Sequence, residues 1–517
     1  MSSPAAQAAD AGIAGIRDCL ARNRAEEAAT LCRAALEDAG NVGDAHRPDL
    51  LGLLGYALSQ AGDREGAIEA FREATTRSPA NPEHHANLGA ALVSADRTEE
   101  AATALEVALR LFPHHANALY NLGLVRQRQW RLEEAVQMYR RAMGAGRQDS
   151  DCAVNLGIAL KDLGAVDLAV QVYRDALAGE PDNANARYNL GIALLLNGEF
   201  AEGWRSYESR WRQTHFRFAR RDLAGPVWDG RPMEGRTLLL QGEQGMGDVV
   251  QFARYAAVAK QGGARVILRC RPRLLDLMAG LDGADMVVSE RLPAPAYDAW
   301  AHLMSLPHIL GTTPATVPAA TPYLHPDQAR VAFWRRQLHS LKGVRIGIGW
   351  QGDPGYAADS RRSIPLPVFA ALARIPGVVL VSLQKGPGRK QMLQIPPDMN
   401  LIDLGPRLDE GTGAFVDTAA VMRSLNLIVT SDTALAHVAG ATGRPVWLGL
   451  PHIPDWRWML GREDSPWYPT MRLFRQPAAE DWEAVFARMA ERLRAEIVAG
   501  NIRRNEDHNH NKPGDAR

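Results

Sequence analysis

LIVTSDTALAHVAGATGRPVWLGL, residues 427–450, decides the fold of the second half of this chain. The runs Leu427–Thr430 and Pro445–Leu450 are apolar, and the first is β-branched, as in strands of a parallel sheet that is covered on both faces. Between them, Ala434–Thr442 has the composition of a short helix. The stretch therefore predicts a β-α-β unit.

The ends of this predicted helix carry the residues that helix ends prefer. Ser431, Asp432 and Thr433 offer N-cap side chains, and Gly443 stands where a residue tolerant of positive φ is wanted. In a β-α-β unit the helix N-terminus lies at the carboxyl end of the strand, where its free N–H groups can bind phosphate. An ordinary capped helix without a ligand is the alternative interpretation.

The composition excludes several classes of protein. Of 517 residues, 59 are Lys or Arg and 59 are Asp or Glu, so no basic field indicates nucleic acid binding. The cysteines form no C-x-x-C pair, which disfavours a disulfide framework or a zinc site: Cys19, Cys32, Cys152 and Cys270. No apolar run approaches the roughly 18 residues that cross a bilayer, and the N-terminus lacks a signal-peptide pattern. We expect a soluble, cytoplasmic protein without a transmembrane segment.

Glycines recur every 34 residues in the first half, each after a leucine: Gly55, Gly89, Gly123, Gly157 and Gly191. Twelve residues after each of the first four stands an alanine, and four residues further stands a larger side chain: Phe71, Leu105, Tyr139 and Tyr173. Small residues let two helices cross closely, and the larger side chain fills the space above the crossing. The period therefore predicts repeated helix pairs.

This pattern resembles the tetratricopeptide repeat, which implies an α-solenoid with a concave binding face. We expect the solenoid over residues 1–215, with regular repeats over about 48–217 and a divergent first repeat at 11–47. The fifth unit departs from the pattern, because Gly203 replaces the alanine. Its aromatic residues are expected to seat the array on the next domain: Trp204, Tyr207 and Trp211.

The second half alternates strand and helix patterns and predicts two Rossmann-like lobes. We expect a linker at 216–234, an N-terminal lobe at 235–310, a second linker at 311–343, a C-terminal lobe at 344–499 and a disordered tail at 500–517. Expected strands are 237–241, 265–269, 286–289, 297–302, 344–350 and 378–383, besides the two of the opening stretch; expected helices are 249–261, 366–375, 415–425 and 478–498. Two such lobes leave a cleft facing the carboxyl ends of both sheets.

That plan is also the plan of the GT-B glycosyltransferases. The turn Gly245–Asp248 and the segment Ser431–Pro445 resemble the heptosyltransferase-like enzymes of glycosyltransferase family nine. Further blocks resemble bacterial proteins that fuse tetratricopeptide repeats to such a domain: 359–365, 381–386, 454–458 and 464–469. The resemblance covers nearly the whole chain and implies a nucleotide-sugar co-substrate, an acceptor-side first lobe and a donor-side second lobe.

Transfer of a sugar from a nucleotide diphosphate needs a base for the acceptor hydroxyl and cations or N–H groups for the leaving diphosphate. The resemblance gives the role of base to Asp248; the alternative is that Asp248 caps the following helix. Gly245, Met246 and Gly247 are expected to line the cleft beside it. No Asp-x-Asp motif follows a strand, so we expect metal-independent transfer without a cofactor.

The donor side is expected in the second lobe. The resemblance places Arg361 and Arg362 against the donor phosphates, and Lys385 is a second phosphate candidate; a solvated surface charge is the alternative for each. Ser431, Asp432, Thr433, Ala434 and His437 form the predicted phosphate- and sugar-binding turn, although His437 is equally interpreted as a core histidine. The remaining residues expected to line the cleft are Trp350, Gln351, Gly352 and Gln384. Trp456, Trp458 and Trp467 offer flat faces for a base or sugar, or serve in packing.

Three functions remain open from the sequence. The first is a glycosyltransferase whose repeat array presents an acceptor, a protein in the leading interpretation. The second keeps the chemistry but transfers the sugar to lipopolysaccharide or capsule glycan. The third is a scaffold for protein–protein interaction whose transferase half is inactive.

Overall fold

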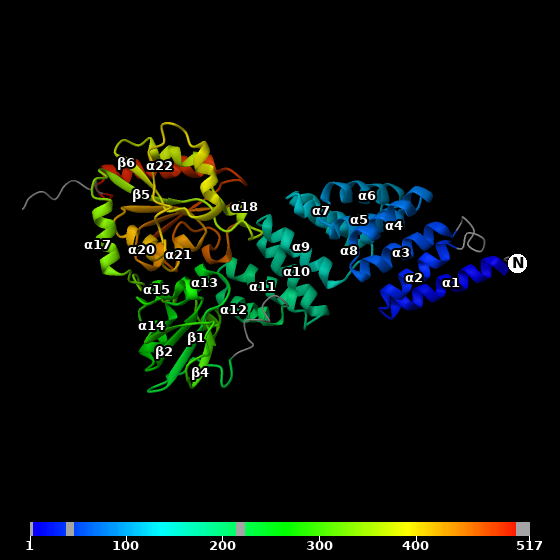
Figure 1. Cartoon of the computed structure of the whole chain (residues 1–517), viewed down its shortest axis with the longest axis horizontal. Helices are drawn as coiled ribbons and strands as arrows, with labels where there is room; N and C mark the ends of the chain where they lie inside the picture. Colours follow the sequence, from blue (N-terminus) through cyan, green and yellow to red (C-terminus); the bar gives the residue numbers. More distant parts are fainter. Residues whose placement is uncertain (1–3, 38–45, 214–222, 503–517) are drawn as a thin grey trace, which may run out of the picture. The chain divides into compact units, whose positions relative to one another are not determined.

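The structure, a computed structural model, describes residues 4–37, 46–213 and 223–502 (Figure 1). The chain forms two compact units, residues 1–190 and 191–517, and the boundary falls inside helix α11 (Ala184–Leu196). Within the described residues, no helix combines the length and the apolar character needed to span a bilayer.

The first unit consists of successive antiparallel helices, as the 34-residue period predicts. Its helices are α1 (Pro4–Ala21), α2 (Ala25–Glu37), α3 (Arg47–Ala61), α4 (Arg64–Arg77), α5 (Pro82–Ser94), α6 (Thr98–Leu111), α7 (Ala116–Arg128), α8 (Leu132–Gly144), α9 (Ser150–Asp162), α10 (Val166–Gly179) and the first half of α11. Acidic residues are frequent in the first turns, for instance Glu99 and Glu100 of α6, where they favour the positive end of the helix dipole.

The repeated glycines lie where the two helices of a pair touch. A Cβ at Gly123 would come within 2.6 Å of the Tyr139 ring, and a Cβ at Gly157 within 2.4 Å of the Tyr173 ring. Both tyrosine rings are fully buried. The glycines are thus required by the close approach of the second helix, which confirms the packing predicted from the period.

The second unit begins with a helical segment that contains α12 (Phe200–Tyr207) and the 3-10 helix η1 (Glu208–Arg212). The boundary between the two compact units therefore lies at residues 190/191, whereas the expected end of the solenoid is residue 215. Trp204 is 1% exposed and packs edge to face on Trp456, with ring centroids 5.1 Å apart. The Tyr207 hydroxyl accepts a hydrogen bond of 2.9 Å from the Gln244 amide, and Trp211 packs on His302 at 4.2 Å. These aromatics seat the segment on the α/β part, as predicted.

The smaller sheet of this unit is parallel, with the strand order β3-β2-β1-β4. Its strands are β1 (Thr237–Gln241), β2 (Arg265–Cys270), β3 (Met286–Ser289) and β4 (Ala299–His302), and its helices include α13 (Met246–Phe252), α14 (Tyr255–Gln261), α15 (Leu275–Met278) and α16 (Leu306–Ile309). The single helix expected at 249–261 is in fact two helices, interrupted at Ala253 and Arg254. The Arg254 side chain folds back to the Gln251 carbonyl at this break.

The larger sheet is also parallel, with the order β10-β9-β8-β5-β6-β7. Its strands are β5 (Val344–Gly349), β6 (Val378–Ser382), β7 (Leu401–Asp403), β8 (Leu427–Ser431), β9 (Val446–Leu450) and β10 (Met471–Arg475); its helices include α17 (Gln328–Gln337), α18 (Asp359–Arg362), α19 (Ala370–Ala373), α20 (Val416–Met422), α21 (Ala434–Ala441) and α22 (Trp482–Val498). The opening stretch forms β8, α21 and β9 as predicted. Strands β7 and β10 were not predicted.

The expected linkers are partly structured. In the first, Trp228 donates a backbone hydrogen bond of 2.8 Å to Trp300 of β4, so this part of the segment extends the smaller sheet. In the second, α17 packs on α20, and the Trp334 indole donates to Asp417 at 2.9 Å. Residues 216–222 and 503–517 of the predicted linker and tail lie outside the described residues.

The order of the larger sheet is that of a doubly wound Rossmann fold, in which the strand order reverses between β5 and β8. Ligands of such folds bind outside the carboxyl ends of the strands at this switch point. In the smaller sheet the corresponding point lies between β1 and β4. The α/β class predicted from the sequence is confirmed, and the switch points identify the strand ends at which a site is expected.

Candidate functional site

The segments that follow β1 and β8 face each other. A Cβ at Gly247 of α13 would lie 3.0 Å from the His437 ring and 3.3 Å from Ala434 Cα, both in α21. A glycine is therefore required for the first turns of these helices to approach so closely. This contact brings Asp248, from the smaller sheet, and Asp432, from the larger sheet, to one side-chain cluster.

Asp248 has two kinds of partner. Its Oδ2 accepts a hydrogen bond of 2.7 Å from the Gly245 N–H, which is a cap of α13, and its Oδ1 is ion-paired with the Arg457 guanidinium. The capping interpretation thus describes this side chain, and its role as a base stays a prediction. Burial raises the pKa of Asp248, whereas Arg457 and the Gly245 N–H oppose the rise. The carboxyl side chain remains 19% exposed.

Arg457, from the segment after β9, connects the larger sheet with α13 of the smaller sheet. Its guanidinium donates to Asp455 at 2.8 Å and to the Gln251 amide oxygen at 2.8 Å, besides its contact with Asp248. The guanidinium also lies 4.2 Å from the centroid of the Trp456 ring. Because the side chain is only 9% exposed, each of these acceptors contributes to holding a buried charge.

Asp432 follows β8 and is 8% exposed. Burial raises its pKa to about 6; Asp455 adds to the rise, and Arg362 and Arg457 oppose it. Of the three N-cap candidates, Thr433 occupies the N-cap position of α21, and its side chain makes no capping hydrogen bond with the described residues. The Asp432 carboxyl therefore does not cap α21, and its charged neighbours are Asp455, Arg362 and Arg457.

Arg362 completes the charged cluster from α18. Its Nε is 3.1 Å from Asp359 Oδ1, and its guanidinium lies 4.6 Å from the centroid of the Tyr356 ring. The Arg362 side chain is 22% exposed, whereas Asp359 is buried. Gly352 leaves room for this pair, because a Cβ there would be within 2.6 Å of both side chains. Arg361, which was predicted beside it, is exposed on the same helix.

His437 belongs to the packing between the lobes. The ring is 5% exposed, its Nδ1 is 3.0 Å from the Tyr468 hydroxyl, and it stacks on Trp458 with centroids 5.5 Å apart. Burial and then the positive charge of Arg457 lower its pKa well below the usual value. The core interpretation of this histidine is therefore the better one, and the ring is neutral.

Two residues expected to line a cleft are buried instead. Trp350 lies in the hydrophobic core of the larger sheet, and its indole N–H donates to the Gly388 carbonyl at 2.9 Å. Gln384 is 5% exposed; its side-chain oxygen accepts from the N–H groups of Trp350 and Gln351 at 2.9 and 3.0 Å. Both predictions are corrected, since a residue at the end of a central strand is enclosed by helices. Gln384 positions the segment Trp350–Gly352, of which Gln351 and Gly352 are half-buried.

The other predicted residues are distributed around the cluster. Lys385 is exposed beyond β6, and its ammonium donates to the Leu408 carbonyl. Ser431 is buried at the end of β8, while Thr433 and Ala434 are half-buried at the start of α21. In the smaller sheet, Gly245 is exposed and Met246 half-buried. Trp456, Trp458 and Trp467 are each no more than 5% exposed, so packing is their role.

Sequence reasoning missed Arg457, Asp455 and Tyr356. Arg457 stands between Trp456 and Trp458 in a segment that follows β9, and only the two tryptophans were expected to contact a ligand. An arginine inside an aromatic run just beyond a buried strand is the signal that could have identified it. Asp455 and Tyr356 lie in loops without a period, so no pattern placed them.

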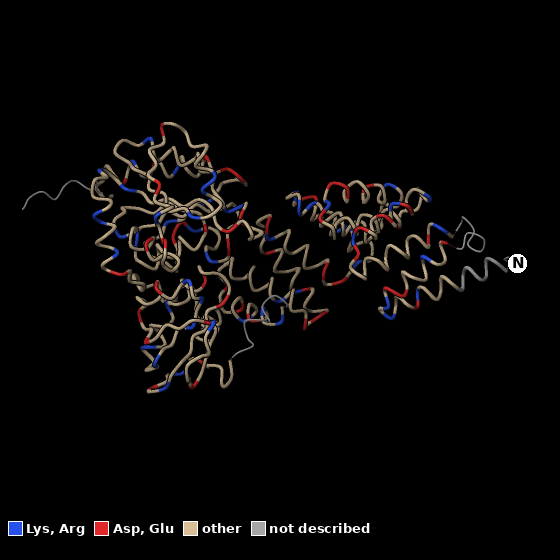
Figure 2. The backbone as a smooth tube through the Cα atoms, in the orientation of Figure 1, with Lys and Arg blue, Asp and Glu red and all other residues tan. Residues whose placement is uncertain are grey.

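The cluster thus combines carboxyls of raised pKa with buried or half-buried guanidiniums: Asp248 and Asp432 with Arg362 and Arg457. A carboxylate of raised pKa is a better proton acceptor, and guanidiniums bind phosphate oxygens in pairs. Elsewhere, basic and acidic residues are interspersed along the helices and loops (Figure 2). The arrangement is suited to proton transfer next to a bound anion.

Comparison with known proteins identifies the first unit. A family model described as tetratricopeptide repeat matches residues 53–113 and 87–150, and one described as TPR repeat matches residues 157–198. These helix pairs are tetratricopeptide repeats. The tetratricopeptide array predicted from the 34-residue period is confirmed over the matched residues, which extend through α11.

Further similarities cover parts of the chain. Protein FlbA of Caulobacter vibrioides is 29% identical over 329 residues, which is 58% of this chain and 53% of that protein, so the chain spans about half the length of this curated relative. A structure of PilF from Pseudomonas aeruginosa has 21% identity and a TM-score of 0.37, covering 42% of this chain and 98% of that one. A thermophilic TPR protein of Thermus thermophilus has 22% identity and a TM-score of 0.31, covering 36% of this chain and 99% of that one.

Proposed function

We propose that the α/β part is a metal-independent glycosyltransferase of GT-B type that uses a nucleotide-sugar donor. The observation that carries the proposal is the meeting of Asp248 and Asp432, from the switch-point segments of two parallel sheets, at Arg457 and Arg362. Opposed switch points of this kind are suited to an activated sugar held between two lobes. The resemblance of the turn Gly245–Asp248 to heptosyltransferase-like enzymes supports the same function.

In this function Asp248 is the base. It takes the proton of the acceptor hydroxyl while the hydroxyl oxygen bonds to the anomeric carbon and the bond from that carbon to the diphosphate breaks. Arg362 and Arg457 receive the charge of the departing nucleoside diphosphate, and the free N–H groups at the start of α21 add to this stabilisation. Asp432 accepts a hydrogen bond from a sugar or ribose hydroxyl.

The contact between Arg457 and Asp248 predicts the order of donor binding and base activation. A diphosphate that binds this guanidinium competes with Asp248 for it, because both are oxygen acceptors of the same donor group. Once Arg457 moves to the diphosphate, Asp248 loses the positive charge that lowers its pKa and becomes a stronger base. Donor binding therefore precedes activation of the base.

Donor binding and donor hydrolysis test the proposal. We expect one nucleoside diphosphate of a panel to raise the melting temperature of the full chain, and the matching nucleotide sugar to be hydrolysed slowly. Asp248→Asn should reduce hydrolysis about 100-fold or more while leaving diphosphate binding within a few fold. Asp398→Asn, a change at an exposed carboxylate, is the control. If no nucleotide binds, or if Asp248→Asn hydrolyses the sugar nucleotide at the normal rate, the assignment is wrong.

The acceptor in this proposal is a protein that binds the tetratricopeptide array, because such arrays present a concave surface to other chains. A lipopolysaccharide or capsule glycan is the alternative acceptor. Transfer by the full chain to protein and to glycan acceptors, measured with a labelled donor, separates the two.

A scaffold for protein–protein interaction is the second candidate function. The matches to tetratricopeptide models at residues 53–150 and 157–198 favour it, since arrays of such repeats present a concave surface to other chains. The ion pair between Asp248 and Arg457 is consistent with it as well, because the pair satisfies both charges without a ligand. Binding of nucleoside diphosphate without any turnover would favour this function over transfer.

A further inference from the structure

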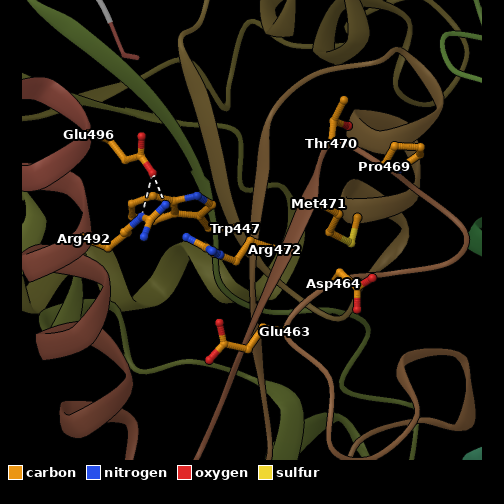
Figure 3. A pocket seen from close by; sticks show the side chains of 9 residues that line it. All are labelled: Trp447, Glu463, Asp464, Pro469, Thr470, Met471, Arg472, Arg492 and Glu496. Atoms are coloured by element: carbon orange, nitrogen blue, oxygen red, sulfur yellow. Dashed lines mark hydrogen bonds and ion pairs between the residues drawn. The ribbon is translucent and has the colours of Figure 1, made fainter. Parts of the chain in front are cut away.

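A hollow lined by arginines lies away from the strand ends discussed above, between the edge strand β10 and helix α22. Its volume is about 380 Å³, and we call it the arginine pocket: Arg462, Arg472, Arg475, Arg488 and Arg492. Glu463 is the one acid among the described residues that line it. A neighbouring hollow of about 490 Å³ shares Arg472, Arg492 and Glu463 with it (Figure 3).

Only part of this positive charge is compensated. Arg462 is paired with Asp464 at 2.7 Å, and Arg492 with Glu496, which also accepts from Asn501 at 2.6 Å. Figure 3 marks the Arg492–Glu496 pair with dashed lines and shows Arg472 and Trp447 lining the same neighbouring hollow. The Arg472 guanidinium makes no hydrogen bond or ion pair with a described residue, although its charge helps to lower the pKa of Glu496.

The other two guanidiniums are bonded to neutral groups. Arg475 donates to the carbonyls of Met459 and Arg462 at 2.7 and 3.2 Å, and Arg488 donates to the Arg475 carbonyl. Carbonyls satisfy N–H groups but leave the charge in place. Burial, followed by the charge of Arg488, lowers the pKa of Arg475. The Arg475 Nε is buried and has no acceptor in the described part of the chain.

The pocket therefore holds Arg472, Arg475 and Arg488 against the single acid Glu463. Like charges gathered in a partly buried hollow repel one another unless an anion lies between them. The apolar walls add little chemistry, because Leu473 and Phe474 are 3% and 7% exposed. A ligand would contact mainly guanidinium groups, whose planar N–H forks fit the oxygens of phosphate groups.

We propose that the arginine pocket binds a small polyvalent phosphate anion of the diphosphate class. The pocket offers no free aromatic face for a nucleobase among its described lining residues, so the phosphate groups alone are recognised. The strand β8, which Asp432 follows, lies two strands from β10, about 10 Å at the usual strand spacing, and the pocket lining includes none of Asp248, Asp432, Arg362 and Arg457. The pocket is thus separate from the cluster of Asp248 and Asp432, and its occupancy does not depend on the proposed transferase activity.

Calorimetric titration of the full chain with sodium diphosphate, at constant ionic strength, tests the pocket. We expect the double variant Arg472→Gln/Arg488→Gln to weaken binding about tenfold or more, because each lost guanidinium removes charge-assisted hydrogen bonds. The control is Arg494→Gln, an exposed arginine of the same helix that does not line the pocket. Unchanged binding in the double variant would overturn the proposal.

A second arm separates this pocket from the proposed donor site. Arg362→Gln should leave diphosphate binding to the arginine pocket unchanged, whereas loss of all binding in Arg362→Gln would assign the anion to the donor site and overturn the proposal. A nucleoside diphosphate should bind the arginine pocket no more tightly than diphosphate itself. Without ligand, the Arg472→Gln/Arg488→Gln and Arg362→Gln variants must melt at the temperature of the wild type. The variant Arg472→Lys/Arg488→Lys keeps the charge and should therefore retain part of the affinity.

Discussion

At neutral pH, the charge on the buried Asp432 carboxylate lowers the free energy of unfolding. Its pKa is about 6 in the folded chain, above that of an unfolded carboxyl, so the folded state binds the proton more tightly. Stability is therefore highest when the group is protonated in both states and falls as the pH rises from about 4 to about 6. Such a cost at a buried carboxyl is typical of a residue retained for a ligand.

We expect Asp432→Asn to stabilise the protein above pH 6. The gain should be on the order of 1–3 kcal/mol and should disappear as the pH approaches 4, because the wild-type carboxyl is then neutral as well. Melting temperatures of both proteins between pH 4.5 and pH 8 measure this difference. For Asp398→Asn we expect the change in melting temperature to have the opposite sign, because Arg374 lowers the pKa of Asp398. A difference that does not depend on pH would contradict the assigned cause.

The pair of Asp248 and Arg457 should show strong coupling. Because both side chains are mostly buried, removing Arg457 leaves the Asp248 carboxyl without its cation, and removing Asp248 leaves Arg457 with Asp455 as its remaining carboxylate partner. We expect Asp248→Asn and Arg457→Gln each to destabilise, and the double variant to lose less than their sum by about 1–3 kcal/mol. Urea unfolding of the four proteins measures this energy. The exposed pair of Asp229 and Arg231 is the control and should show no measurable coupling.

At the scale of the residue, the sequence indicated the position in the fold of side chains that directly follow a strand or begin a helix, while their functional roles stay predictions. Asp248 and Asp432 stand at such positions, and the fold fixes what those positions face. Prediction from sequence failed where a side chain is fixed by a loop, as for Arg457 and Asp455, and for Trp350, whose enclosure depends on distant helices. The burial that raises the Asp432 pKa is a property of the packed structure and cannot be read from neighbours in sequence.

At the scale of the element, the repeated glycines define a test of helix packing. A Cβ at Gly157 would meet the buried Tyr173 ring at 2.4 Å, so we expect Gly157→Ala to destabilise by about 1–3 kcal/mol. Gly179, the last residue of α10, has open space where its Cβ would lie. Gly179→Ala should be neutral or stabilising by up to about 1 kcal/mol. Circular dichroism melts compare the two; equal effects would contradict the role of the repeated glycine.

The segment after α12 is tied to the glycine-rich turn by a buried ionic network. Arg210, which is fully buried, donates to Glu243 at 2.9 Å and to Ser305 at 2.7 Å, and it also pairs with Glu208. We expect Arg210→Met to destabilise the protein by roughly 3–5 kcal/mol, because it leaves the buried Glu243 carboxylate without its cationic partner. Adding Glu243→Gln should restore a substantial part of this loss, since the amide oxygen can still accept from the Met304 N–H.

Thermal unfolding of the single and double variants checks this network. Arg231→Met, which removes an exposed arginine, serves as the control and should have little effect. A double variant that is less stable than Arg210→Met alone would show that Glu243 is not left uncompensated by the single change.

Elements were predictable where a period or a continuous apolar run marks them. The 34-residue period indicated the helix pairs, and short, largely apolar runs indicated β1 to β6, β8 and β9. The run Met471–Arg475 of β10 carries two arginines, and β7 is three residues long, so neither has the apolar length of a buried strand. The break between α13 and α14 lacks a glycine or proline, and therefore no residue type there predicts a division of that helix.

At the scale of the molecule, the boundary inside α11 predicts which truncations fold. Removal of residues 1–183 keeps α12 and η1, and we expect a soluble protein with a cooperative melt. Removal of residues 1–215 would expose the buried rings of Phe252, Trp456 and Trp467 and leave Glu243 without Arg210. We expect this shorter chain to aggregate or to melt well below the first one. Soluble yield and scanning fluorimetry compare them, and equal stability would place the boundary at residue 215 after all.

The burial of Trp204 by Trp456 and Trp467 has a consequence for synthesis. The ribosome makes the aromatic face of α12 about 250 residues before it makes the rings that cover that face. At about 5–20 residues per second, this aromatic surface stays uncovered on the nascent chain for on the order of 10–50 s. The helices of the first unit precede this face in the sequence and are complete by then, so we expect the exposure of this face to depend on the rate at which the second half of the chain is synthesised.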